Sequence, residues 1–137
     1  MVTVIAEISG NSLHSVTAQL VGAAGGGATV LCPGGIGASE AATLSGVAKV
    51  ISVEGDCFSS FDGGAWASAL GSVAEGRILA ASTANGREIA ARMAAAKGVA
   101  VVQDVTSISG NSVSRSIYSG KAVASITISD DTILTLR

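Results

Sequence analysis

The feature that most constrains the fold is a regular alternation of two kinds of segment over residues 1–105. Short runs rich in Val, Ile and Leu alternate with longer runs dominated by small residues, and glycine or polar residues separate them. The first kind predicts buried strands and the second predicts helices that pack closely on them. Strands are expected at residues 1–7, 28–32, 49–53, 77–81 and 99–105, and helices at 15–24, 38–45, 65–73 and 85–97. This order predicts an α/β fold, a three-layer sandwich whose mostly parallel sheet is covered on both faces.

After Asp104 the pattern changes to three short alternating runs, separated by the turn sequences YSGKA and SDD. Alternation of apolar and polar residues is typical of half-buried strands, and short polar turns join antiparallel neighbours. We therefore expect a C-terminal antiparallel ribbon added to the parallel sheet, with Asp130 and Asp131 in a solvated turn. The length suits one domain over residues 1–137.

Charged side chains make up only 13% of the chain, and the net charge is -2. No cluster of Lys or Arg marks a nucleic-acid surface, and aromatic residues, at 3%, are too few for base stacking. No apolar run approaches the roughly 20 residues needed to cross a bilayer, and the start of the chain lacks the basic region of a signal peptide. We expect a cytoplasmic protein without membrane insertion, whose low charge leaves surface for a partner or a second copy.

No catalytic or metal-binding pattern is legible. His14 is the only histidine, and no Cys or carboxylate stands at ligand spacing from it. No Gly-x-Ser-x-Gly turn presents a serine nucleophile. Cys32 and Cys57 form no Cys-x-x-Cys pair and are expected to be free thiols, with a redox pair as the alternative. Glu7 ends the first expected strand, at the edge where parallel sheets bind ligands. The chain is expected not to be an enzyme, with an enzyme of the same fold as the remaining alternative.

The most suggestive local motif is a small polar loop before the best expected helix. Its candidate ligand-binding residues are Ser82, Thr83, Asn85, Gly86 and Arg87. Backbone N–H groups at a helix start favour anions and Arg87 adds a bidentate donor, so a phosphate site is one interpretation. Asn85 as the helix N-cap explains the loop without a ligand, and Gly86 permits close approach by a ligand or a partner chain. Cap, partner contact and phosphate site all stay open.

Four segments together resemble the N-terminal domain of the electron transfer flavoprotein alpha subunit. They are VTVIAEISGNSL, GVAKVISVEGD, GREIAARMAAAKGVAVVQDV and RSIYSGKAVASI. They are similar to the family's opening strand and turn, its third-strand segment, its helix–strand segment and its Arg-x-Ile-Tyr-Ala-Gly-Asn-Ala signature. The chain departs from the family pattern at Ala91, where a proline usually precedes the arginine, and at Lys121, which replaces the signature asparagine.

The resemblance implies a nucleotide-binding fold of the adenine-nucleotide alpha-hydrolase-like type, with the strand order 3-2-1-4-5. A ligand crevice is then expected between the first and fourth strands, bordered by residues 7–10 and 82–87. The expected partner contacts are Arg115, Tyr118, Gly120 and Lys121, which lie in the signature segment.

The resemblance also implies a role. In the family, the alpha subunit pairs with a beta subunit of similar fold, and the dimer carries electrons from dehydrogenases through FAD, with AMP bound in the beta subunit. Most FAD contacts come from a C-terminal domain beyond the segment matched here, so no cofactor is expected in this chain alone. The expected function is a non-catalytic scaffold that docks a beta-type subunit. The alternative is a stand-alone adenine-nucleotide-binding protein that uses the crevice.

Overall fold

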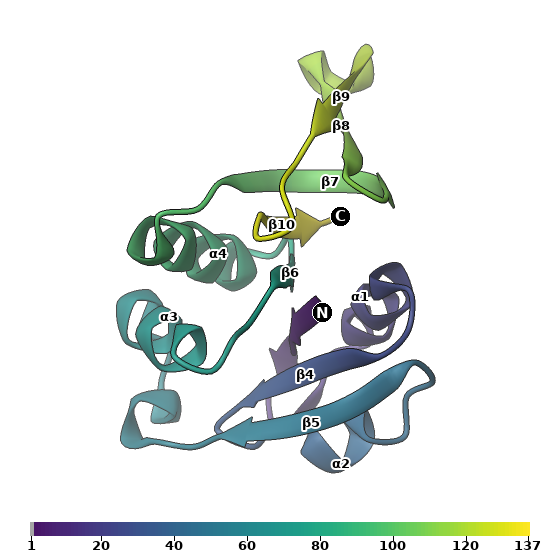
Figure 1. Ribbon diagram of the computed structural model, residues 1–137. Coiled ribbons are helices and arrows are strands. Elements are labelled where there is room, and N and C mark those ends of the chain that lie inside the picture. Colours follow the sequence, from purple (N-terminus) through teal and green to yellow (C-terminus); the bar gives the residue numbers. More distant parts are fainter. Residues whose placement is uncertain (1) are drawn as a thin grey trace.

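One large sheet forms the middle layer of the molecule. The computed structural model describes residues 2–137, and its eight-stranded sheet has the order β5-β4-β1-β6-β10-β7-β8-β9 (Figure 1). Its strands are β1 (Val2–Ile5), β4 (Ala28–Pro33), β5 (Val47–Val53), β6 (Arg77–Ala81), β7 (Val101–Ser109), β8 (Ser112–Ile117), β9 (Ala122–Thr127) and β10 (Ile133–Leu136). All neighbours from β5 to β7 are parallel, whereas β7, β8 and β9 pair antiparallel. The predicted mostly parallel sheet with an antiparallel extension is confirmed.

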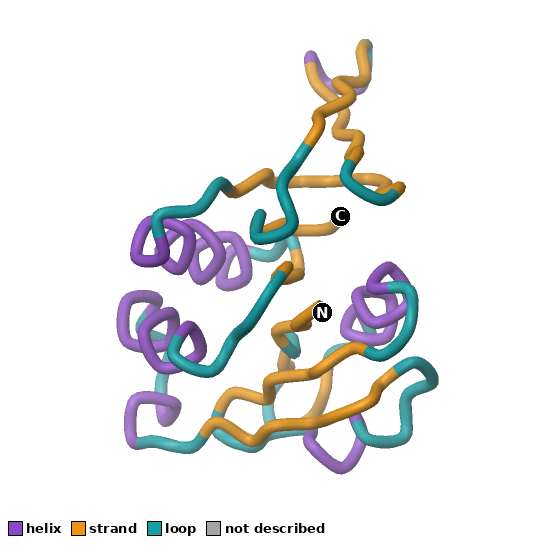
Figure 2. Tube along the Cα trace, in the orientation of Figure 1, coloured by secondary structure: helices purple, strands orange, loops and turns teal. Residues whose placement is uncertain are grey.

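Helices cover both faces of the parallel part of the sheet. They are α1 (Val16–Ala24), α2 (Ala38–Ala41), α3 (Gly63–Gly71) and α4 (Ala84–Lys97), with the short 3-10 helices η1 (Asp56–Ser59) and η2 (Tyr118–Gly120). Figures 1 and 2 show α3 and α4 on one side of the sheet and α1 and α2 on the other. A separate small hairpin joins β2 (Ile8–Ser9) to β3 (Ser12–Leu13). The predicted three-layer sandwich is therefore confirmed.

Successive residues of the central strands bury their side chains on opposite faces, as a pleated backbone requires. Val4 belongs to the core cluster beneath α1, together with Leu20 of that helix. Ile5 belongs to the second cluster, which contains Ile89 and Met93 of α4. Because both faces are covered, the central strands are mostly apolar on both faces, with buried threonines such as Thr3 and Thr135 as the exceptions.

The last strand corrects the predicted topology. Its alternating sequence predicts that it joins the antiparallel ribbon, and the fourth and fifth expected strands are predicted to be neighbours. Instead β10 lies between β6 and β7 and runs parallel to both. Burial gives the physical reason: Ile133, Leu134 and Thr135 are each 0% exposed, which suits a strand covered on both faces. The order 3-2-1-4-5 is correct for the first four strands and wrong in placing the fifth beside the fourth.

Most element boundaries lie close to the predicted ones. The first expected strand ends at Ile5, and residue 1 lies outside the described residues. The helix expected at 38–45 is a single turn, because α2 ends at Ala41. Cys32 and Cys57 are both free thiols, and burial in the sheet raises the pKa of the Cys32 thiol.

The antiparallel ribbon, defined as β8, β9 and the turn between them, stands away from the rest of the molecule (Figures 1 and 2). In its register Arg115 lies opposite Ala124, and Val113 lies opposite Ile126. Because side chains alternate along a strand, these residues share one face and the serines at 112, 114 and 116 share the other. The ribbon therefore has a polar hydroxyl face and a more apolar face that carries one arginine.

Candidate functional site

The fold rule places the predicted crevice at the point where the order of the strands along the sheet reverses. From β1 the chain moves to β4 and β5 on one side, and then crosses to β6 on the other side of β1. Open α/β sheets bind ligands outside the carboxyl ends of the strands at such a point. Glu7 follows β1 and residues 82–87 follow β6. Burial raises the pKa of the Glu7 carboxyl and the Thr83 hydroxyl lies close enough to lower it in part, so the two predicted loops are neighbours; this place is called the switch crevice below.

The start of α4 is capped by Thr83 and not by Asn85. The Thr83 hydroxyl accepts a hydrogen bond from the Gly86 N–H at 3.1 Å, and the helix begins at Ala84. Asn85 lies exposed inside the first helical turn. The prediction that Asn85 is the N-cap is therefore wrong, because a threonine two residues earlier already has the extended backbone that a cap requires.

Gly86 is explained by packing inside the chain. It is buried, and a Cβ atom added to it would overlap the carbonyl oxygen of Ala81 at the end of β6. The first turn of α4 thus rests directly on the strand that precedes it. The missing side chain at Gly86 makes room for the chain's own backbone.

Arg87 faces a carboxylate of the neighbouring strand. Its Nη1 atom lies 3.0 Å from Oδ2 and 3.2 Å from Oδ1 of Asp104, and the Gln103 amide donates to the Arg87 carbonyl at 3.2 Å. The side chain of Arg87 is 49% exposed and that of Asp104 is 19% exposed. The guanidinium that sequence reasoning offers to an anion is therefore already partly neutralised within the chain.

A bulge in β7 holds Asp104 in place. Asp104 has a left-handed backbone with a φ of 59°, and the register of β7 against β10 shifts at this point. The Thr135 hydroxyl accepts from the Asp104 N–H at 2.9 Å and from the Ser82 hydroxyl at 3.0 Å, and it donates to the Gln103 side chain at 2.6 Å. This buried threonine links β6, β7 and β10 at the edge of the crevice, so the position of Asp104 is fixed by three strands.

Glu7 makes the other side of the switch crevice acidic. Burial raises the pKa of the Glu7 carboxyl, and the Thr83 hydroxyl and the nearby His14 lower it only in part. The Thr17 hydroxyl bonds to both the backbone N–H and the carbonyl of Glu7, which holds this turn against α1. A carboxylate beside a helix start opposes the binding of a phosphate group.

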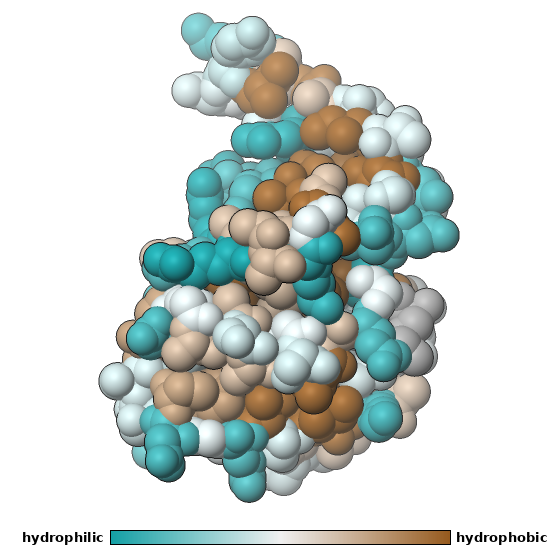
Figure 3. Space-filling view, turned by 60° about the vertical axis from the view of Figure 1, so that its left-hand side comes forward, coloured by the Kyte–Doolittle hydropathy of each residue, from teal (hydrophilic) through white to brown (hydrophobic). Residues whose placement is uncertain are grey.

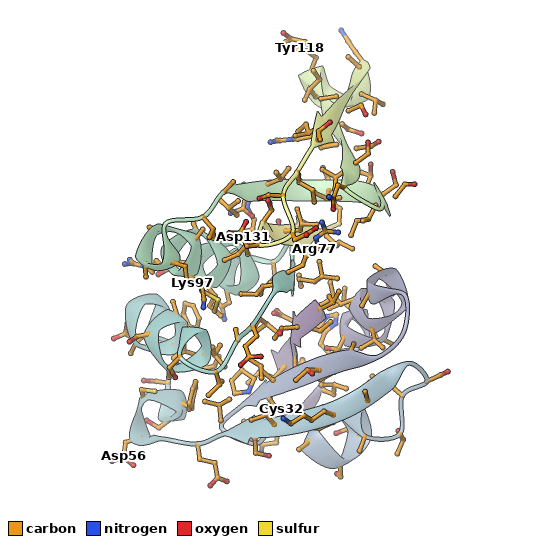
Figure 4. All side chains as sticks on the ribbon, in the orientation of Figure 1. Cys32, Asp56, Arg77, Lys97, Tyr118 and Asp131 are labelled. Atoms are coloured by element: carbon orange, nitrogen blue, oxygen red, sulfur yellow. The ribbon has the colours of Figure 1, made fainter. Side chains whose placement is uncertain are left out.

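The predicted partner contacts lie together on the ribbon. Tyr118 and Lys121 are exposed at its turn, Gly120 is exposed between them, and Arg115 is half-buried further down β8. Tyr118 is 77% exposed, and Figure 4 shows it at the far tip of the ribbon, away from the rest of the molecule. The four residues therefore lie on one projecting segment, and their role in binding a partner stays a prediction.

A cavity along the ribbon, here called the ribbon cavity, includes a residue that sequence reasoning missed; it extends from Thr106 and Arg137 to the turn at Tyr118. Its volume is about 680 Å³, and Arg115 and Arg137 both line it. Arg137 reaches this place because β10 lies in the centre of the sheet, where the Arg137 N–H donates to the Val105 carbonyl at 3.0 Å. No local signal in the sequence brings these two arginines together, since they come from different parts of the sheet.

The remaining candidate metal ligands and catalytic side chains do not form a cluster within the described part of the chain. Over residues 2–137, no three His, Cys, Asp or Glu side chains lie where they could hold a metal ion. His14 accepts a hydrogen bond from the Val16 N–H at 3.0 Å through Nδ1, which is the geometry of a helix start. No helix within these residues is long and apolar enough to cross a membrane.

Comparison with known proteins agrees with this architecture. A protein-family model described as the electron transfer flavoprotein domain matches residues 2–136. No curated protein matches the chain by sequence.

Proposed function

Because the chain belongs to the electron transfer flavoprotein domain family, we propose that it is a non-catalytic, alpha-like scaffold. In this proposal it docks a beta-type subunit, or a related partner, in FAD-dependent electron transfer. The observation that carries the docking part is the projecting ribbon with Tyr118 at its tip, 77% exposed. A large aromatic side chain held so far from the core contributes little to folding, and tyrosine and arginine are typical anchors of protein interfaces.

The surface of the ribbon supports docking further. Figure 3 shows hydrophobic surface on the ribbon and on the part of the molecule just beneath it. Val123 of β9 is 67% exposed, and β9 is the outer strand of the sheet, so its backbone has a free edge. An exposed strand edge with apolar side chains is a ready surface for another chain. The proposed partner therefore covers the ribbon.

The crevice residues do not fit a flavin pyrophosphate. Two phosphates need donors that are free of internal partners. At the start of α4 the one guanidinium is paired with Asp104, and Glu7 adds a negative charge beside it. In the proposal this chain therefore supplies shape and surface, and FAD is held by other parts of the assembly.

Mixing the purified chain with a beta-type electron transfer flavoprotein subunit tests the docking. We expect a stable complex in sedimentation velocity and a binding constant at least about tenfold weaker for Tyr118→Ala. Val73→Ala, which removes another exposed apolar side chain near the end of α3, is the matched control and should bind like the unmodified chain. Two species that sediment separately would refute the proposal, whereas a self-associating chain would point to a homodimer instead.

A stand-alone adenine-nucleotide-binding protein is the second candidate. The position of the α4 start at the switch crevice favours it. Calorimetry with AMP, ATP and FAD tests it, with Arg87→Ala as the variant. Heat that saturates at submillimolar AMP and weakens in Arg87→Ala would support this candidate. No heat at millimolar ligand would exclude it.

A further inference from the structure

Two arginines of the chain differ from the other three in having no internal partner. Arg77, Arg87 and Arg92 are each held by acceptors of neighbouring residues. In the described part of the chain, the guanidinium groups of Arg115 and Arg137 make no hydrogen bond or ion pair, and both line the ribbon cavity. Two uncompensated positive charges thus lie around one space.

The remaining wall of this cavity is rich in hydroxyl groups. Thr106, Ser116 and Ser119 contribute hydroxyls, and no Asp or Glu side chain lines it. Asp104, the nearest acidic residue along β7, is bound to Arg87. The volume of about 680 Å³ is within the range of small-molecule sites. The side chains that line the cavity therefore include two cations and several hydroxyl donors but no carboxylate.

One donor in this cavity is both shielded and unused. The Nε atom of Arg115 is buried from solvent and has no hydrogen-bond partner. Buried donors in folded proteins almost always have a partner, so an isolated one points to an acceptor supplied from outside. The Nε of Arg77 is also unpaired, but its terminal nitrogens donate to Gly110, Asn111 and Ser129. Within residues 2–137, Arg115 combines a buried Nε with terminal nitrogens that make no hydrogen bond.

We propose that the cavity binds the phosphate group of a small phosphomonoester. A phosphomonoester carries close to two negative charges at neutral pH, which matches the two guanidinium groups. The planar fork of an arginine binds two phosphate oxygens at once, and hydroxyls of the same wall can donate to the third. A neutral ligand leaves both cations unpaired, and a single carboxylate balances only one of them.

This site is separate from the switch crevice, but it shares Arg115, Tyr118 and Gly120 with the surface proposed for docking. The crevice is bordered by Glu7 and residues 82–87, none of which lines the ribbon cavity. The test uses the isolated chain, so its outcome is independent of whether a beta-type subunit binds.

Titration with inorganic phosphate, followed by NMR of the arginine Nε–H groups, tests the site. At constant ionic strength and pH 7.5, we expect a saturable shift of the Arg115 Nε–H signal at millimolar phosphate, with the Arg92 signal unmoved. Acetate should bind at least about tenfold more weakly, because it brings one charge where phosphate brings nearly two. Phenyl phosphate should compete with inorganic phosphate for the same signal.

Matched variants separate this site from general attraction of anions. Arg137→Gln should weaken phosphate binding at least about fivefold as read from the Arg115 signal, since one of the two cations is lost. Arg92→Gln, which removes an equal charge from α4, should leave the affinity unchanged. The proposal is overturned if the Arg115 signal does not saturate, if acetate binds as tightly as phosphate, or if both variants weaken binding equally.

Discussion

The switch crevice lies after the parallel strands β1 and β6, whereas the ribbon cavity lies between the antiparallel strand β8 and the end of β10, and the two differ in how their charges are paired. In the crevice, Arg87 is paired with Asp104, and the first turn of α4 packs on the end of β6. In the ribbon cavity, Arg115 and Arg137 have no internal partner within residues 2–137. The comparison teaches that the place where a fold usually binds ligands can be filled by the chain's own packing. The arginines without an internal partner lie instead beside the antiparallel ribbon, which the rule about the carboxyl ends of parallel strands does not cover.

Gly86→Ala is expected to have the largest effect on stability. It tests whether the crevice is closed by the packing of α4 on β6. The added Cβ meets the Ala81 carbonyl, so α4 must shift, and we expect a loss of about 3 kcal/mol in the free energy of unfolding. Urea unfolding measures it. Gly22→Ala in α1 is the matched control, because nothing lies within 4 Å of its added Cβ. The control should gain about 0.5–1 kcal/mol from helix propensity alone. Equal effects of the two substitutions would show that the start of α4 is open to a ligand or a partner.

Thr135→Val tests the hydrogen bonds that fix the acidic edge of the crevice. Valine has nearly the same shape, but it leaves the Asp104 N–H and the Gln103 side chain without their partner. We expect a loss of about 2 kcal/mol in the free energy of unfolding, because Thr135 is fully buried. Thr127→Val on the exposed side of β9 is the control and should change stability by less than about 0.5 kcal/mol. A loss no larger than that of the control would mean that the bulge is held by other contacts.

Glu7 and Thr135 show which parts of the site the sequence predicts and which it does not. Strand and helix alternation predicts the layers, and the family resemblance implies the order of the first four strands and the proximity of Glu7 to residues 82–87. The sequence pattern does not predict that Thr135 links three strands. The alternation of residues around Thr135 predicts instead a half-buried strand of the antiparallel ribbon. The central position of β10 depends on long-range pairing with β6 and β7, which leaves no local trace in the sequence.

The same limit applies to the charges. The Gly-Arg pair at the start of α4 is visible as a motif, but its neutralisation depends on Asp104, which is 17 residues away along the chain. Arg115 belongs to a recognisable signature segment, whereas Arg137 joins its cavity only through the placement of β10. Sequence patterns therefore find residues that bind anions, and the fold decides which of them are free to do so.

Substituting one arginine of each site compares the paired guanidinium of Arg87 with the unpaired guanidinium of Arg115. Arg87→Gln removes an ion pair that is partly exposed, so we expect a loss of about 0.5 kcal/mol in the free energy of unfolding. Arg115→Gln removes a charge without an internal partner, so stability should stay the same or rise slightly. Chemical unfolding at low and at moderate salt measures both. A larger loss for Arg115→Gln than for Arg87→Gln would show that Arg115 has a structural partner.

The smallest expected effect concerns the acidic side of the crevice, through Glu7→Gln. Burial raises the pKa of Glu7 in the folded chain, so the folded state holds its proton to a higher pH than the unfolded state does. Between the two pKa values the native state binds more protons, and the stability that this carboxyl contributes is present at low pH and lost as the pH rises through its folded pKa. At pH 7 the charged, partly buried carboxylate therefore costs stability, and glutamine at this position should raise the melting temperature.

The pH profile distinguishes this cause from a general gain. The advantage of Glu7→Gln should be largest near neutral pH and should shrink as the pH falls toward the ordinary value of 4.5 for a glutamate. Glu54→Gln, at an exposed position after β5, is the control and should change the melting temperature little. An advantage that persists at low pH would mean that the amide makes new contacts. A lower melting temperature at pH 7 would mean that the start of α4 stabilises the Glu7 carboxylate. The negative charge of Glu7 would then be partly offset by the N-terminal end of the helix.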